Sequence, residues 1–451
     1  MSIHRSCLVG FAITAVVLLA SAVPTSAQVF SVVTNFGAAA SNPYFVTPVQ
    51  GRDGKLYGTT LTDNVNSAGT VFVLDVKTGS RFTLHRFDTA TGSSPQGGLT
   101  LGTDGNFYGT AQFGGTANYG VLFKLTPNGT YSVLHNFAGG TDGLYPSSPP
   151  VQAADGNFYG TTGQITAFGE SQSTAYQYKL SGLFTSFGDI PNTIAPLIQA
   201  ANGNLYGTTY NGGCGSVFEL STSGALLNEY PFSCGTGGST PFGPVMQAAD
   251  GNFYGTTQRG GTSDYGTVFK MDQSGLLSIL YSFPGSGPYP EDGLVEGSDG
   301  KLYGNAWGAP STLFRITTGA SFTLLYTLNS HDGDAVGAAL LQDTTGVFYG
   351  TAYAGGGPGD GGTLFSLDVG LAPFIALVNR QGRVGSIAQI LGQGFTGSTS
   401  VTFHGVAASS FHVLSDTYMT AVVPSGATSG PVAVTTPNST LTSNRNFRVL
   451  Q

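Results

Sequence analysis

An eight-residue phrase recurs seven times along this chain of 451 residues. Its clearest copy occupies residues 155–162 (DGNFYGTT), and the copies centre on seven tyrosines that stand 46 to 51 residues apart. These are Tyr57, Tyr108, Tyr159, Tyr206, Tyr254, Tyr303 and Tyr349. A period of this length, carried by strand-forming residues, is typical of a β-propeller.

Each repeat predicts four short antiparallel strands, which is the content of one propeller blade. Residues 157–162 give a second strand, and residues 267–271 and 277–283 show the alternation expected of the third and fourth strands. Asp155 and Gly156 stand between two apolar runs and predict a two-residue hairpin turn with both residues at positive φ.

The two ends of the repeat region predict a closed ring. The seventh copy supplies three strands and stops after residues 364–367, whereas residues 29–36 resemble the fourth strand at residues 131–137. The N-terminal strand is therefore expected to complete the seventh blade, which removes the exposed edges of an open array. The sequence predicts an all-β chain with a seven-bladed β-propeller over residues 28–371 and a small β-sandwich over residues 372–451.

Residues 1–27 have the pattern of a secretory signal peptide. Arg5 precedes an apolar run at residues 8–20, and small residues at 25–27 suit a cleavage site. A membrane anchor is the less favoured alternative because the apolar run is short. The mature chain is expected to be secreted, either extracellular or at the cell surface, with no membrane span.

The charge balance argues against a nucleic-acid partner. The chain has a formal net charge of −8 and only 9% charged residues, so it lacks the basic stripe that contacts phosphates. Cys214 and Cys234 flank a predicted hairpin of residues 216–220 and 225–232. They suit either a disulfide across that hairpin or a pair of free buried thiols, and the sequence leaves both open.

Two parts of the chain resemble known families. The phrases at residues 390–395, 401–405, 421–424 and 430–434 resemble the immunoglobulin-like IPT/TIG domain, which implies a spacer or interaction module of an exported bacterial protein. The repeats over residues 29–367 resemble the GloVer-type tandem repeat, through DGNFYGTT, a Gly-Gly pair and GTVFK. That resemblance implies an exported bacterial protein with one of several C-terminal anchors, and it implies no established catalytic activity.

Function is expected on the face of the propeller that carries the long, variable connections. Residues 138–149 and 284–292 are two such connections between blades. Aromatic residues in the long loops either stack on a ligand or cap the apolar layers between blades. They are Tyr44, Phe45, Tyr145, Phe242, Tyr289 and Trp307. The ligand-binding candidates are Trp307, Tyr289, Glu291 and Tyr145.

No catalytic residue, metal site or cofactor is predicted. His85 and His135 occupy a repeat position that holds Tyr281 and Tyr326 in other blades, which indicates packing and not catalysis. Residues 331–334 (HDGD) suit a polar turn better than a metal site.

The favoured hypothesis is an exported binding or scaffold protein that recognises a polysaccharide or a surface protein, with the C-terminal domain as a spacer or docking module. The alternative is a carbohydrate-active hydrolase or lyase that uses carboxylates of the long-loop face, with Glu291, Asp292, Asp332 and Asp334 as candidates. A structural surface component without a specific ligand is a third hypothesis. The oligomeric state is left open.

Overall fold

The computed structural model describes residues 28–37, 42–63, 65–163, 173–210, 213–357 and 359–450. Strands dominate these residues, with two single-turn 3-10 helices, η1 (Gly140–Asp142) and η2 (Gly235–Gly237). Within this part of the chain no helix has the length and apolar character needed to cross a membrane. The predicted signal peptide, residues 1–27, lies outside the described residues.

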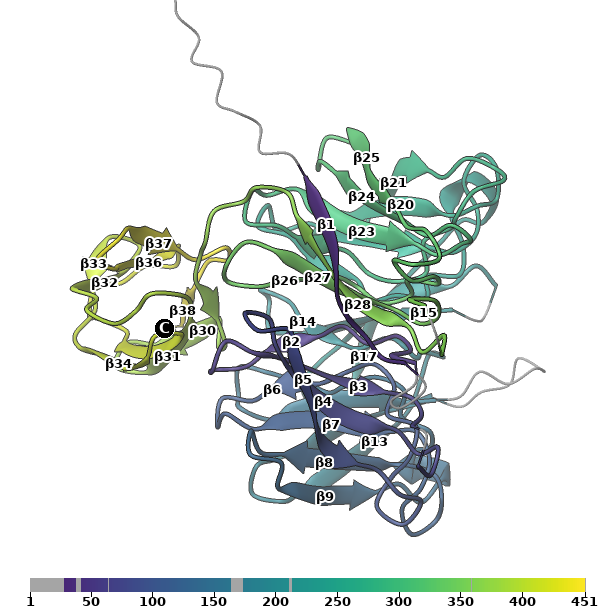
Figure 1. The fold of residues 1–451 in the computed structure, drawn as a ribbon, viewed down its shortest axis with the longest axis horizontal. Coiled ribbons are helices and arrows are strands. Elements are labelled where there is room, and N and C mark those ends of the chain that lie inside the picture. The colour runs from purple at the N-terminus through teal and green to yellow at the C-terminus, as the bar shows by residue number, and fades with distance from the viewer. Residues whose placement is uncertain are drawn as a thin grey trace, which may run out of the picture.

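Seven four-stranded antiparallel sheets account for the repeats in the described residues (Figure 1). Each begins with a two-residue strand, followed by three longer strands. The first three sheets are β2 (Val49–Gln50), β3 (Leu56–Thr60), β4 (Thr70–Asp75) and β5 (Ser80–Arg86); β6 (Thr100–Leu101), β7 (Phe107–Ala111), β8 (Val121–Leu125) and β9 (Tyr131–Asn136); and β10 (Val151–Gln152), β11 (Phe158–Thr162), β12 (Ser173–Tyr178) and β13 (Phe184–Ile190).

The next three sheets follow the same order. They are β14 (Ile198–Gln199), β15 (Leu205–Thr209), β16 (Ser216–Leu220) and β17 (Leu226–Pro231); β18 (Met246–Gln247), β19 (Phe253–Thr257), β20 (Thr267–Met271) and β21 (Leu277–Ser282); and β22 (Val295–Glu296), β23 (Leu302–Ala306), β24 (Thr312–Ile316) and β25 (Phe322–Thr327). The prediction of an all-β chain built from four-stranded antiparallel sheets is confirmed.

The last sheet of the repeats joins the two ends of the repeat region. It contains β26 (Leu341–Gln342), β27 (Phe348–Ala352), β28 (Thr363–Asp368) and the N-terminal strand β1 (Val29–Asn35). Strand β1 pairs antiparallel with β28, with Phe30 opposite Leu367. The ring of Phe30 also stacks on Tyr326 of β25, with centroids 4.1 Å apart. The first strand of the chain therefore contacts the sheets of its last two repeats.

The turn between the first two strands differs from the sequence prediction, which was wrong. The N–H of Ala153 donates to the carbonyl of Asn157 (2.9 Å), and that of Gly156 donates to the carbonyl of Ala153 (2.9 Å). Of the Asp155–Gly156 pair only the glycine has a positive φ, 82°. This is a three-residue loop, a turn followed by a left-handed glycine. The Asp155 carboxylate favours it by accepting the Asn157 N–H (3.0 Å) and the Tyr159 hydroxyl (2.7 Å).

A glutamine at the end of the first strand connects neighbouring sheets. Gln152 accepts the N–H of Thr103 in the preceding sheet (2.8 Å) and donates to the carbonyl of Gly156 in its own turn (2.9 Å). The same link to the preceding sheet is made by Gln199 with Ala154, Gln247 with Ala201, Gln342 with Ser298, and Gln50 with Thr344. Because Gln50 belongs to the first repeat and Thr344 to the last, these two repeats contact one another as neighbours.

The central glycine of the repeated phrase makes room for an aromatic ring. A Cβ at Gly109 would lie 2.6 Å from Cζ of Phe123, and one at Gly255 would lie 2.7 Å from Cζ of Phe269. These distances are shorter than close packing of non-bonded atoms permits. Both phenylalanines belong to third strands and are fully buried. The glycine is therefore a requirement of the core and not of a binding site.

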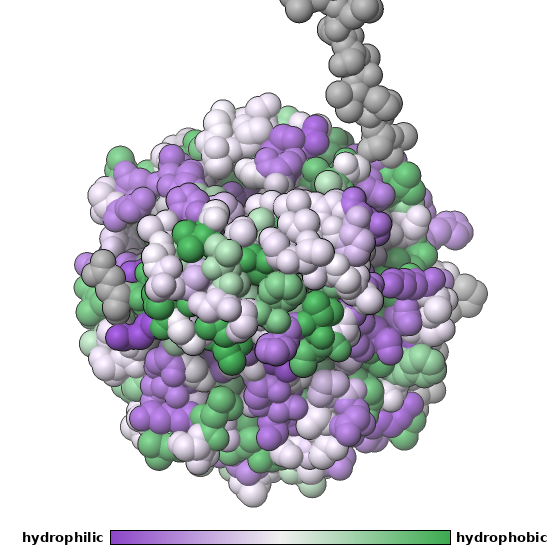
Figure 2. Space-filling model, turned by 90° about the vertical axis from the view of Figure 1, so that its left-hand side faces the viewer, coloured by the Kyte–Doolittle hydropathy of each residue, from purple (hydrophilic) through white to green (hydrophobic). Residues whose placement is uncertain are grey.

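The C-terminal segment forms two further four-stranded sheets and a two-stranded pair. Its strands are β29 (Ala376–Leu377), β30 (Gln381–Arg383), β31 (Ile387–Leu391), β32 (Ser400–Phe403), β33 (Val406–Ala407), β34 (Phe411–Ser415), β35 (Tyr418–Val422), β36 (Val432–Thr435), β37 (Thr440–Thr442) and β38 (Arg448–Leu450). Residues of both sheets, among them Ile390, Phe403, Met419 and Val434, share one buried core. Figure 2 looks onto the side of the molecule that carries this segment, where apolar and polar side chains are interspersed.

The C-terminal segment is docked on the repeats by specific polar contacts. The hydroxyl of Thr417 donates to the carbonyl of Arg52 (2.7 Å), and the Arg52 guanidinium donates to Gln389 (2.7 Å) and lies 4.5 Å from the centroid of Tyr418. Arg445 forms an ion pair with Glu296 of β22, whose side chain is 5% exposed. These contacts hold the segment against the tight-turn end of the sheets.

Candidate functional site

The connections between sheets bring one residue from each repeat together. This residue stands four positions before the first strand of each sheet. The seven are Phe45, Gln96, Ser147, Ile194, Phe242, Glu291 and Gly337. All of them except Gly337 line a pocket of about 310 Å³, together with Tyr44, Gln112, Phe113 and Asp292. We call it the crossover pocket.

A second set of residues supports the first. It consists of the residue that follows each second strand: Leu61, Gln112, Gly163, Tyr210, Gln258, Trp307 and Tyr353. Gln258 donates to Oε1 of Glu291 (2.7 Å), and Gln96 donates to Oε1 of Gln112 (2.7 Å). The lining side chains are thus fixed by contacts to the ends of buried strands, which suits a pre-formed site.

Aromatic rings form one part of the crossover pocket. The ring centroids of Phe45 and Phe242 lie 5.9 Å apart, although the two residues come from the first and fifth repeats. Tyr44 contacts the ring of Phe45 at 4.2 Å and that of Tyr353 at 5.0 Å. Phe45 has a φ of 52°, a conformation that is costly for a bulky residue and is found most often at functional sites.

Two adjacent carboxyl groups form another part of the pocket. Asp292 accepts the N–H groups of Gly293 (2.6 Å) and Ala339 (2.9 Å). Burial and the neighbouring Glu291 together raise the pKa of Asp292 from 3.8 to about 7, although these two hydrogen bonds lower it. Burial also raises the pKa of Glu291, while the hydrogen bond from Gln258 opposes the rise. Carboxyl groups with raised pKa values in a pocket are candidates for function.

The charged side chains in the described lining of the pocket are acidic. No Lys, Arg or His is among the lining residues that the structure describes. The internal segments outside the described residues, namely 38–41, 64, 164–172, 211–212 and 358, contain none of these residue types in their sequence.

Of the four predicted ligand-binding residues, the structure places Glu291 in the lining of the crossover pocket. Trp307 and Tyr289 pair through two backbone hydrogen bonds of 2.9 and 2.8 Å. The Trp307 ring lies against Gly337, where a Cβ would be 2.9 Å from its Cε3 and Cζ3 atoms. Tyr145 packs against Phe113 (5.3 Å) and Tyr119 (5.6 Å). These three aromatic residues support the wall and are not among the described lining residues.

Sequence reasoning missed the polar residues of the pocket, Gln96, Gln112 and Ser147, and the apolar Ile194. A signal for them exists in the chain. When the seven repeats are aligned, the position four residues before the first strand holds six different residue types. By contrast, the neighbouring strands repeat nearly the same phrase.

His85, His135 and Asp332 of the HDGD segment make structural contacts. His85 stacks on Tyr131 (3.9 Å) and His135 on Phe184 (3.5 Å), in both cases a ring of the adjacent sheet. Asp332 accepts the hydroxyl of Tyr326 (2.9 Å) and the N–H of Asn329 (3.0 Å), as a turn-capping carboxylate does. Within the described ranges, no group of three or more His, Cys, Asp and Glu side chains could hold a metal ion.

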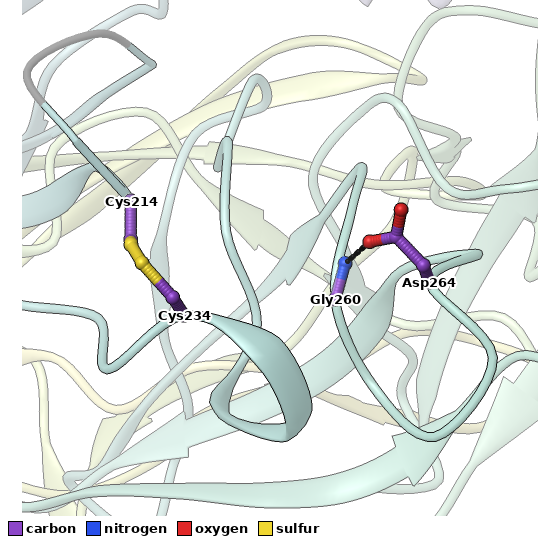
Figure 3. The surroundings of a disulfide bond; sticks show 4 residues. All are labelled: Cys214, Cys234, Gly260 and Asp264. Atoms are coloured by element: carbon purple, nitrogen blue, oxygen red, sulfur yellow. Dashed lines mark hydrogen bonds between the residues drawn. A yellow bond between two sulfur atoms is a disulfide. The ribbon is translucent and has the colours of Figure 1, made fainter.

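The two cysteines of the hairpin are joined in the structure. Cys214 and Cys234 form a disulfide with a Cα–Cα distance of 5.2 Å, within the usual range for such bonds. Figure 3 shows this disulfide beside the loop in which the N–H of Gly260 donates to Asp264 (2.8 Å). The bond ties the loop after β15 to the connection after β17.

The repeats carry a recognisable family signature. Residues 21–176 and residues 150–310 each match the model of the Gloeobacter/Verrucomicrobia repeat. Together the two matches span more than half of the chain. This chain belongs to the Gloeobacter/Verrucomicrobia repeat family. The sequence-based resemblance of the repeats to that family is thereby confirmed. No curated protein matches the chain significantly in sequence.

Some solved structures resemble this Gloeobacter/Verrucomicrobia repeat protein at low sequence identity. A fungal alcohol oxidase of the AA5 family, in complex with copper, is 14% identical with a TM-score of 0.50, over 92% of this chain and 100% of that one. A putative gluconolactonase is 10% identical with a TM-score of 0.44, over 77% and 94%. PorZ, a surface component of the type-IX secretion system of Porphyromonas gingivalis, is 14% identical with a TM-score of 0.45, over 93% and 61%. These similarities concern a propeller-like all-β fold alone.

Proposed function

We propose that this Gloeobacter/Verrucomicrobia repeat protein is an exported, non-catalytic binding protein that recognises carbohydrate in its crossover pocket. In this proposal residues 1–27 are a signal peptide, and residues 28–371 are a seven-bladed β-propeller closed by β1. Residues 372–451 are an immunoglobulin-like module of the IPT/TIG type. The crossover pocket is then the mouth of the propeller channel.

The contacts between the first and last repeats support the closed ring. Gln50 accepts the N–H of Thr344 (3.1 Å), and β1 supplies the outer strand of the last sheet. Residues of β2, β6 and β26, such as Val49, Leu101 and Leu341, line a common cavity of about 300 Å³. A channel bordered by first strands accounts for these contacts because the innermost strands of a propeller surround its axis.

The composition of the crossover pocket carries the functional proposal. Aromatic faces, amide groups and carboxyl groups converge there, which is the combination that stacks on sugar rings and hydrogen-bonds their hydroxyls. Its volume of about 310 Å³ stands at the lower end of the usual range for ligand pockets, roughly 300–1,000 Å³. The lining position four residues before each first strand also differs between the otherwise similar repeats, as expected for a site that a symmetric scaffold places on its axis.

The C-terminal module is proposed to close the opposite end of the channel. Ala376, Val378 and Leu391 line the cavity that the first strands border. Together with the ion pair of Arg445 and Glu296, this favours a fixed docking module over a flexible spacer. A ligand would then have one open end of the channel available.

A glycan array tests the proposal with purified wild-type protein and the double variant Phe45→Ala/Phe242→Ala. The control is Phe82→Ala, which removes a ring that is 63% exposed on β5, outside the pocket. We expect specific glycans to bind the wild type and the control variant. The same glycans should not bind the double variant. Empty arrays with folded wild-type protein would count against it, as would binding that survives the double variant.

A carbohydrate-active enzyme remains the second candidate because of one observation, the raised pKa of about 7 of Asp292, which suits a general acid. Both Asp292 oxygens accept backbone N–H groups, however, which favours a structural role. Release of reducing ends from polysaccharides by the wild type, lost in both Glu291→Gln and Asp292→Asn, would replace the binding proposal by this one.

A further inference from the structure

The crossover pocket presents negative charge without a counter-charge. Glu291 and Asp292 both line it, and the described lining residues include no basic side chain. Buried and half-buried carboxylates in proteins are usually paired with a cation. Among the buried carboxylates of the described residues, Asp63 is paired with Arg86 and Glu296 with Arg445, whereas Glu219 and Asp343 accept hydrogen bonds from neutral groups. Glu291 accepts one such bond from Gln258, and a cationic ligand would supply the counter-charge that the described lining does not.

The aromatic rings stand close to these carboxyls. Tyr44 lines the crossover pocket together with Glu291 and Asp292. Phe45, in contact with Tyr44, also lines the pocket, as does Phe242. Aromatic faces attract cations through their negative quadrupole, and a neighbouring carboxylate adds to this attraction. A neutral sugar would stack on these rings and donate its hydroxyls to the carboxylates, but only a cationic sugar would also neutralise the charge of Glu291.

The amide groups define what else the ligand carries. Gln96 and Gln112 hydrogen-bond each other, and Gln112 contacts the hydroxyl of Ser147 (3.5 Å). Such groups both donate and accept, which matches hydroxyl groups. An alkylamine without hydroxyl groups would leave the side chains of Gln96, Gln112 and Ser147 without a ligand partner. Polar groups that stay unpaired in a complex lower the affinity.

We infer that the ligand of the crossover pocket is an amino sugar, whose ammonium group occupies the space between the Phe45 and Phe242 rings and the Glu291 carboxylate. This inference rests on the proposed function and narrows it to a substrate class. The hydroxyl groups of the sugar face Gln96, Gln112 and Ser147. Polymers that contain free, unacetylated amino sugars are the corresponding macromolecular partners.

Calorimetric titration at neutral pH tests the inference with four probes. They are a β-1,4-linked glucosamine trisaccharide, its fully N-acetylated counterpart, cellotriose, and butylammonium as a mimic of a lysine side chain. The acetylated sugar keeps the ring and loses the charge, whereas butylammonium keeps the charge and loses the ring. The proteins are the wild type, Glu291→Gln, and the control Glu229→Gln, which removes the same charge from an exposed position of β17.

The expected result is that the glucosamine trisaccharide binds at least about tenfold more tightly than the other three probes, since an ammonium group held by a carboxylate and aromatic faces is worth about that factor. Glu291→Gln should abolish this preference and Glu229→Gln should keep it. Equal or tighter binding of the acetylated sugar or cellotriose would overturn the inference and leave the carbohydrate proposal standing. Butylammonium binding as tightly as the trisaccharide would overturn the assignment to a sugar. Failure of all four probes would count against both.

Discussion

At the residue scale, the protein separates positions that repeat from positions that vary. Tyr254 and its six equivalents are buried, and five of the seven hydroxyls donate to the aspartate of the preceding turn, at 2.7 Å for Tyr254 and Asp250. The residues four positions before each first strand share no such role and converge on the pocket. Regularity therefore marks the scaffold, and irregularity marks the candidate site.

Asp292 makes the stability of the fold depend on pH in a direction that is unusual for a carboxylate. Because its pKa in the folded protein is raised from 3.8 to about 7, the folded state binds the proton more tightly than the unfolded chain. Its contribution to stability is therefore present at low pH and is lost as the pH rises between about 4 and about 7. Urea unfolding over this range should show a smaller loss of stability with rising pH in Asp292→Asn than in the wild type. Parallel pH profiles would contradict the assignment.

Trp307 provides a built-in reporter of the pocket. It is the only tryptophan of the chain, and it lies on Gly337, where a Cβ would be 3.2 Å from Cε1 of Phe45. A ligand that contacts Phe45 should shift the tryptophan emission, with the same dissociation constant as calorimetry gives. The variant Phe82→Ala should behave as the wild type. Calorimetric binding with unchanged emission would place the ligand elsewhere.

At the element scale, a single glutamine amide connects five of the seven sheets to the preceding sheet. Gln247→Leu removes the acceptor of the Ala201 N–H (2.7 Å) and the donor to the Gly251 carbonyl (2.9 Å). The second repeat has Leu101 at the equivalent position, so a leucine fits sterically. Unfolding by urea should show a loss of about 1–3 kcal/mol for the unpaired backbone groups. The exposed turn variant Gln273→Leu should cost little, and equal effects of the two variants would refute the connecting role.

Much of this level could be predicted from the sequence, because strand order, repeat length and the permuted first strand follow from hydrophobic pattern and spacing. The turn type could not, since it depends on the hydrogen bonds that Asp155 makes to Asn157 and Tyr159. In the pocket, the sequence singles out Glu291 as a ligand-binding candidate, which stays a prediction. Gln96 and Ser147 have no local pattern of their own, and they emerge only when residues about 50 positions apart are aligned across the repeats.

At the scale of the whole molecule, the C-terminal segment has its own core and is docked on the repeats by polar contacts. The contacts that dock it come from scattered residues such as Arg52, Glu296 and Arg445, which no sequence pattern connects. A segment docked on the tight-turn end leaves the crossover pocket free, which fits a protein that presents one binding face.

Arg445→Ala tests the docking. The change leaves the Glu296 carboxylate, which is 5% exposed, without its cation, and loss of one partner of a buried pair costs about 3–5 kcal/mol. The double variant Glu296→Gln/Arg445→Met should recover most of the lost stability in urea unfolding. An unchanged unfolding curve for Arg445→Ala would mean that the segment is not held by this contact in solution.

The most direct test of the central claim, that recognition takes place where the seven repeats differ, is hydrogen–deuterium exchange with and without the strongest glycan from the array. The account predicts protection of the connections around residues 42–45, 94–98, 145–148, 240–243 and 289–293, whose side chains line or support the crossover pocket. Protection confined to residues 372–450 or to the outer strands of the sheets would contradict it.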